Sequence, residues 1–176
     1  MKQLLKISLL AFVLGSLVES GPAEAADASV GSTSSAPLNA LFSPNGGIGA
    51  KLADLIFNAQ SSIAIAAYNI YLPDVSNSLA GARARGVKIR IIMDTDATGS
   101  RLTDIGMYRN NKIPVYLWTQ GVMRDSFMIV DEKTLAVGSF EWTVNGDTSN
   151  VGSMIFTQNP EAVKAYLTQF NKLWGP

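Results

Sequence analysis

The sequence predicts an α/β domain in which helices cover a mixed β-sheet, and three observations support this fold class. Between residues 46 and 118, segments with helical apolar spacing alternate with short runs rich in β-branched residues. Two further runs, at 126–130 and 135–140, flank a four-residue polar turn that is typical of an antiparallel hairpin. The chain has 176 residues, which is enough for one domain with an apolar core and too few for two.

The first 25 residues have the pattern of an export signal. Lys2 and Lys6 precede a nearly continuous apolar run, Ile7 to Val18, and Ala23-Glu24-Ala25 places small residues where a signal is cut. The run is shorter than the ~20 residues that span a bilayer, which favours a cleaved signal over a membrane anchor. We therefore expect an exported protein, periplasmic or secreted, with no transmembrane segment once residues 1–25 are removed.

Residues 26–40 are rich in Ser, Ala, Gly and Thr without apolar periodicity, so we expect a flexible lead-in there. The domain is expected to span 41–176. Its first half alternates helix and strand in the order helix 46–60, strand 62–68, helix 73–86 and strand 87–94. Ser43 or Asn45 is available as the N-cap of the first helix.

The second half of the domain ends in the hairpin and one further helix. Its expected elements are a helix over 101–110, a strand over 113–118, the hairpin strands 126–130 and 135–140, a strand over 151–157, and a helix that starts at Asn159-Pro160. Helices alternating with strands and then a hairpin predict a mixed sheet.

The composition excludes several kinds of chemistry. The chain contains no Cys, so it has no disulfides, thiolate metal ligands or Cys nucleophile. It also contains no His, the side chain best suited to proton transfer near neutral pH. Lys and Arg together number 14, as do Asp and Glu, so net charge does not indicate a polyanionic partner.

Three clusters of residues allow both a functional and a structural interpretation. Asp94-Thr95-Asp96 follows a strand, where a metal site is conceivable, but turn and capping roles are more common for these residues. The basic residues Arg83, Arg85, Lys88 and Arg90 either follow a nucleic-acid backbone or form a solvated face. The aromatic residues Tyr108, Tyr116, Trp118 and Trp142 either stack on bases or belong to the core. We expect neither a cofactor nor a metal centre.

Several segments together resemble the single-motif bacterial endonuclease branch of the phospholipase D superfamily. They are Phe42 to Gly47, Ala66-Ala67-Tyr68, Arg85-Gly86-Val87 and Val122 to Thr143, and the likeness runs from about Leu41 to Trp174. Its most specific part is the spacing of Asp131 from Gly138-Ser139, followed by Trp142-Thr143. The resemblance implies a phosphodiesterase fold and a homodimer that assembles its active site across the two-fold axis.

The catalytic motif of that family is degenerate in this sequence. The family uses a His nucleophile, a Lys two residues later and a polar residue after the Gly-Ser pair; here these positions hold Arg124, Ser126 and Glu141. Asp131 and Ser139 remain from the motif. A guanidinium has no lone pair for phosphorus and stays protonated, so Arg124 can neither attack nor transfer a proton.

The substituted residues suggest two interpretations of the site. Arg124 and Glu141 have opposite charge and face the same site in relatives, so they can form an ion pair that plugs it. Alternatively, Arg124 binds a phosphodiester from a nucleic acid or a phospholipid headgroup. We favour the ion pair, because Glu141 and the loss of the Lys both oppose anion binding.

We expect a catalytically silent domain with a binding or structural role. The alternative is an active phosphodiester hydrolase, of nuclease or phospholipase D type, in which Ser126 or Ser139 is a nonstandard nucleophile. A Ser nucleophile needs an adjacent base, and a chain without His must supply it from Asp, Glu or Lys.

Overall fold

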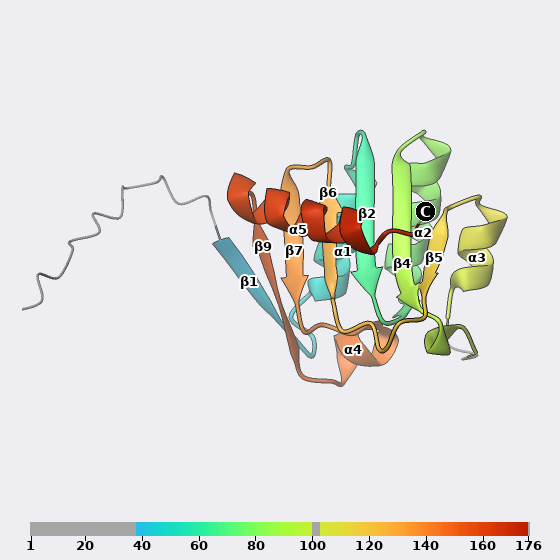
Figure 1. Ribbon diagram of the computed structural model, residues 1–176. Helices are drawn as coiled ribbons and strands as arrows, with labels where there is room; N and C mark the ends of the chain where they lie inside the picture. The colour runs from blue at the N-terminus through green and yellow to red at the C-terminus, as the bar shows by residue number, and fades with distance from the viewer. Residues whose placement is uncertain (1–37, 100–102, 176) are drawn as a thin grey trace, which may run out of the picture. The chain divides into compact units, whose positions relative to one another are not determined.

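A seven-stranded mixed sheet lies between helices in the computed structural model, which describes residues 38–99 and 103–175 (Figure 1). Its strands are β1 (Leu38–Ser43), β2 (Ser62–Ala67), β4 (Lys88–Asp94), β5 (Val115–Trp118), β6 (Phe127–Val130), β7 (Thr134–Gly138) and β9 (Gly152–Thr157). The order across the sheet is β1-β9-β7-β6-β2-β4-β5. β2, β4 and β5 are parallel neighbours, and the remaining pairs are antiparallel. The predicted mixed sheet is confirmed.

Helices cover both faces of this sheet. α1 (Ile48–Phe57) and α2 (Pro73–Ala84) pack on one face, where every second side chain of β2 and β4 belongs to the larger apolar core. α5 (Pro160–Leu173) crosses the opposite face, on which Phe170 packs with Ala66, Ile92 and Phe127 (Figure 1). Central strands buried on both faces explain the nearly continuous apolar sequence of β2.

The remaining elements are short. They are α3 (Ile105–Asn110), α4 (Val144–Thr148), a 3₁₀ turn over Asp96–Gly99, and a two-stranded parallel sheet of β3 (Ile70–Tyr71) with β8 (Trp142–Thr143). Within the described residues, no helix combines the length and apolar character needed to cross a membrane.

The start of the domain differs from the expectation. Strand β1 begins at Leu38, three residues before the expected boundary, because its backbone pairs with β9 although Leu38 to Ala40 are exposed. The expected lead-in over 26–37 lies outside the described residues.

The N-terminus of α1 is capped by a distant residue. Neither Ser43 nor Asn45 caps the helix; Gly47 occupies the N-cap position with φ 78° and offers no side chain. Instead, the Asp147 carboxylate accepts the Gly49 N–H at 3.1 Å, and the Asp147 carbonyl accepts the Asn45 N–H. A carboxylate suits this end of a helix, and its position here depends on tertiary folding.

Most other predicted elements are confirmed, with ends that shift by a few residues. The helix predicted over 101–110 is helical from Ile105, and residues 101–102 lie outside the described range. Asn159 caps α5 as predicted, since its side-chain oxygen accepts the Ala162 N–H at 3.0 Å.

Candidate functional site

An open cleft of about 700 Å³ lies at the edge of the sheet where β2, β4 and β7 end. Ligands of α/β proteins commonly bind at this edge, beyond the carboxyl ends of parallel strands. The lining residues come from three regions: the end of β2 and the turn after β4 (Tyr68, Asn69, Asp96), the approach to β6 (Val122 to Ser126), and the segment from β7 through β8 (Gly138 to Thr143).

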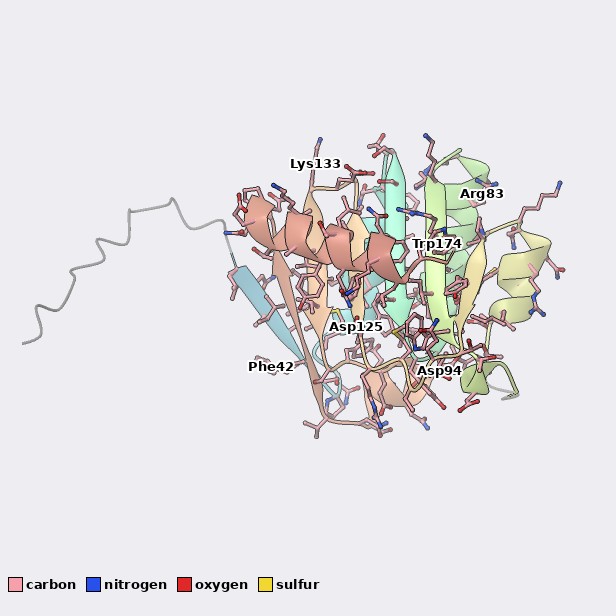
Figure 2. The ribbon with its side chains drawn as sticks, in the orientation of Figure 1. Phe42, Arg83, Asp94, Asp125, Lys133 and Trp174 are labelled. Atoms are coloured by element: carbon pink, nitrogen blue, oxygen red, sulfur yellow. The ribbon has the colours of Figure 1, made fainter. Side chains whose placement is uncertain are left out.

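Four of the five predicted site residues line this cleft together: Arg124, Ser126, Ser139 and Glu141. The fifth, Asp131, does not belong to it. Asp131 follows β6 and lies at the opposite end of that strand from Ser126. Figure 2 shows the same separation, with Lys133 of the β6–β7 turn and Asp94 at opposite ends of the sheet.

The Asp131 side chain has a structural role at the start of β2. Its carboxylate accepts hydrogen bonds from the backbone N–H groups of Gln60, Ser61 and Ser62 at 2.7–3.2 Å, and from the Ser61 hydroxyl at 2.8 Å. Burial opposes ionisation of this carboxyl, but the four donors outweigh burial and hold its pKa below the usual value. Asp131 therefore fixes the turn between α1 and β2 to the hairpin.

Arg124 and Glu141 share the cleft but do not form the expected ion pair. Among the described residues, the one ion pair joins Lys51 to Asp54. The Glu141 carboxylate instead accepts the side-chain amide of Asn150 at 2.7 Å, and both Arg124 and Glu141 are exposed. The predicted plug is wrong: an exposed pair gains too little to hold two flexible side chains together, and the neutral Asn150 already satisfies Glu141.

Ser126, which the resemblance places where a Lys is expected, uses its hydroxyl both as a donor and as an acceptor. It donates to the Phe140 carbonyl at 2.9 Å and accepts the indole N–H of Trp142 at 3.0 Å. Trp142 is 2 % exposed, so this hydroxyl supplies the hydrogen bond that a buried indole needs. Ser126 thus joins the start of β6 to the segment after β7.

Ser139 follows a position that only glycine fits. A Cβ at Gly138 would collide with the backbone carbonyl of Ser153, because β7 and β9 approach closely there. The Ser139 hydroxyl accepts the Ser153 N–H at 3.2 Å, and the Ser153 carbonyl accepts the Ser139 N–H at 2.9 Å. Gly138-Ser139 therefore sets the wall of the cleft.

The Asp94 carboxylate accepts backbone N–H groups in the turn after β4, which agrees with the turn and capping role favoured for Asp94-Thr95-Asp96. It is 2 % exposed and accepts the Asp96 N–H at 2.8 Å and the Met123 N–H at 2.7 Å. The second bond fixes the loop that leads to Arg124. The hydrogen bond to Met123 joins residues 29 positions apart, so it could not be predicted from the local sequence.

Two of the four basic residues singled out on α2 and β4, Arg85 and Arg90, have structural contacts. Arg85 donates to the Phe57 carbonyl at 2.7 Å and lies over the Phe57 ring, which closes the C-terminal end of α1. Arg90 lies over the Phe170 and Trp174 rings at 4.8 and 5.4 Å and anchors α5.

The aromatic residues are mainly part of the core. Tyr108 and Trp142 are buried, and Tyr116 packs against Trp174. Trp118 is half-buried and lines a smaller hollow beside the cleft together with Arg124.

Among the cleft residues that were not predicted as site residues, two have chemically distinctive side chains. Tyr68 is 48 % exposed at the end of β2, and Asp125 is half-buried between the two substituted motif positions. Asp125 could have been predicted as a cleft residue, because it directly follows Arg124 in the sequence.

The mixed sheet, the hairpin and the cleft at its edge define an α/β domain of the phospholipase D type. Residues 52–174 match the family model described as the cardiolipin synthase, PLD-like domain. The chain belongs to this family.

Solved structures agree with this family. The phospholipase D family member Nuc from Salmonella typhimurium superposes with a TM-score of 0.73 at 27 % identity, covering 78 % of this chain and 93 % of that one. NucT from Helicobacter pylori has the same fold, with a TM-score of 0.68 at 21 % identity over 78 % of this chain and 96 % of that one.

Curated relatives are similar over part of their length. A mitochondrial cardiolipin hydrolase of Xenopus tropicalis is 29 % identical over 121 residues, which are 68 % of this chain and 58 % of that protein. A phospholipase D of Rickettsia conorii is 29 % identical over 127 residues, which are 72 % of this chain and 64 % of that protein. The matches thus span somewhat more than half of these relatives.

Proposed function

We propose that this chain is a catalytically silent phospholipase D-like domain that keeps its cleft as a binding site. The observation that carries the proposal is the residue at the nucleophile position. Arg124 lines the cleft there, and the chain has no His to take its place. A guanidinium remains protonated at any physiological pH and cannot attack phosphorus.

A second copy of the chain does not supply the missing group. In a homodimer, each partner would contribute an Arg124 in place of the attacking His and of the His that protonates the leaving group. Both roles would be lost together.

The contacts of the two cleft serines give little support to the alternative hydrolase. Ser126 directs its proton to a backbone carbonyl and its lone pair to Trp142, so no base activates it. The hydrogen bond found for Ser139 is to the backbone N–H of Ser153, and that bond does not remove a proton.

Export and homodimer formation are further parts of the proposal. The signal pattern in residues 1–25 supports export to the periplasm or the medium, and the family resemblance supports a homodimer. Mass spectrometry of the protein from fractionated cells tests removal of residues 1–25. Sedimentation equilibrium tests the homodimer.

The silent state is tested by phosphodiesterase assays on the purified protein. The substrates are single-stranded DNA, RNA, bis(p-nitrophenyl) phosphate and phosphatidylcholine, so that nuclease and lipase chemistry are both covered. We expect no turnover above the rate without protein. Hydrolysis that is abolished by Ser126→Ala or Ser139→Ala would contradict the proposal and establish a nonstandard nucleophile.

A further inference from the structure

The chain contains two Asn-Gly sequences, at Asn45-Gly46 and at Asn145-Gly146. Asn followed by Gly is chemically labile, because the Gly nitrogen can attack the side-chain carbonyl carbon of Asn and no Gly side chain hinders the attack. The attack needs rotation about the Asn Cα–C bond and a nitrogen that can release its proton. The surroundings of each peptide unit therefore decide whether it reacts.

The peptide unit between Asn45 and Gly46 is open to solvent. It lies in the turn between β1 and α1, and both residues are exposed. Within the part of the chain that the structure describes, neither the Asn45 carbonyl nor the Gly46 N–H has a hydrogen-bond partner, and the Asn45 side-chain amide has none. The attacking nitrogen and the carbon that it attacks are thus both accessible and unrestrained.

The peptide unit between Asn145 and Gly146 is held on both sides. Asn145 is also exposed, but Gly146 is buried within α4 and its N–H donates to the Thr143 hydroxyl at 2.9 Å. The Asn145 carbonyl accepts the N–H groups of Ser149 and Asn150 at 2.9 and 2.8 Å. Rotation at residue 145 would break these hydrogen bonds, and an N–H that donates to a hydroxyl releases its proton less readily.

We propose that Asn45 is a site of spontaneous deamidation in the folded protein and that α4 protects Asn145 from the same reaction. Hydroxide removes the proton of the Gly46 N–H, and the nitrogen then forms a bond to Cγ of Asn45. The side-chain nitrogen leaves as ammonia after taking a proton from water, which gives a five-membered cyclic imide. Water opens this imide: cleavage of the bond to Cγ gives aspartate, and cleavage of the bond to the backbone carbonyl carbon gives isoaspartate.

The modification changes the contacts at the N-terminal end of α1. The Asn45 N–H donates to the Asp147 carbonyl at 2.8 Å, and Gly46 lies so close to the Phe42 carbonyl that a Cβ there would collide with it. Isoaspartate lengthens the backbone between these two contacts. Both products also add a negative charge to a residue that contacts Asp147, whose carboxylate accepts the Gly49 N–H. We therefore expect faster hydrogen exchange of the Gly49 amide after modification.

Peptide mapping by mass spectrometry tests the site on the purified protein. The folded protein and a sample in urea are incubated at mildly alkaline pH, and conversion of amide to carboxyl is followed at both Asn residues. In the folded protein, Asn45 should react at least about fivefold faster than Asn145, as expected where a hydrogen bond must first break at Gly146. In urea the two rates should become similar. Electron-transfer fragmentation distinguishes isoaspartate from aspartate in the product.

Asn45→Gln is the test variant, because attack on a Gln side chain must close a larger ring and is slower. Conversion at residue 45 and the faster exchange of the Gly49 amide should both be lost in this variant. The matched control, Asn145→Gln, should keep both. Three results would overturn the inference: no conversion at Asn45 in the folded protein, conversion of Asn145 at the same rate, or a ratio of the two rates that urea leaves unchanged. Unchanged exchange of the Gly49 amide in converted protein would overturn the predicted effect on α1.

Discussion

At the scale of single residues, the degenerate motif separates into two kinds of position. Asp131, which the sequence retains, holds three backbone N–H groups at the start of β2. Arg124, Ser126 and Glu141, which replace family residues, all line the cleft. Of the two retained positions, Asp131 therefore serves the fold, whereas Ser139 lines the cleft beside the changed positions.

Substitution of Asp131 by Asn should destabilise the protein at neutral pH by about 1–2 kcal/mol. The donors now bind two carboxylate oxygens, whereas an amide offers them a single oxygen. The pKa of Asp131 is lower in the folded state, so its stabilisation is complete above the ordinary value of about 3.8. The stabilisation is lost as the pH falls through the lowered folded pKa. Urea unfolding at pH 7 and at successively lower pH measures this difference.

Glu132→Gln is the control for that experiment, since Glu132 is the exposed neighbour of Asp131. The Asp131 variant and the unmodified protein should converge at low pH, and the Glu132 variant should match the unmodified protein throughout. A stability gap for Asp131→Asn that persisted unchanged at low pH would argue against a role for its charge.

At the scale of elements, the loop that presents Arg124 is held from another strand. Asp94 at the end of β4 accepts the Met123 N–H, and Ser126 joins β6 to Trp142 of β8. Three separate elements thus determine where the substituted residues lie.

Substitution of Asp94 by Asn should loosen this loop. One of the two N–H groups that Asp94 accepts would face an amide donor, at a cost of about 1–3 kcal/mol in a buried position. Thermal unfolding measures the loss of stability, and hydrogen exchange at the Met123 amide measures the loosening. Asp96→Asn, at an exposed position, is the control, and equal behaviour of the two variants would exclude the proposed role of Asp94.

Much of the fold was predictable from periodicity, and the reasons for the exceptions are physical. The strands and long helices have apolar patterns that a local sequence window contains. Strand β1 has three exposed residues and forms through backbone pairing with β9, more than 100 residues away. The α1 cap comes from Asp147, which no local rule connects to Gly49.

Four of the five predicted residues belong to the site, but their contacts were not predictable. The spacing of the motif predicted four residues that line one cleft in the structure: Arg124, Ser126, Ser139 and Glu141. Opposite charge then suggested an ion pair between Arg124 and Glu141, but solvent exposure and Asn150 decide the contact of Glu141. The exposure of Glu141 and its hydrogen bond to Asn150 are properties of the folded chain, so the sequence alone did not predict them.

At the scale of the whole molecule, the family fold is present and the cleft is formed. The fold superposes on Nuc with a TM-score of 0.73. We propose that three substitutions, rather than any distortion of the scaffold, make the domain catalytically silent.

The most direct test is the phosphodiesterase activity of the triple variant Arg124→His, Ser126→Lys, Glu141→Asn, measured beside the unmodified protein on bis(p-nitrophenyl) phosphate and single-stranded DNA. Circular dichroism first establishes that both proteins are folded. We expect turnover by the triple variant and none by the unmodified protein. Turnover by the unmodified protein, or a folded triple variant without activity, would contradict this expectation.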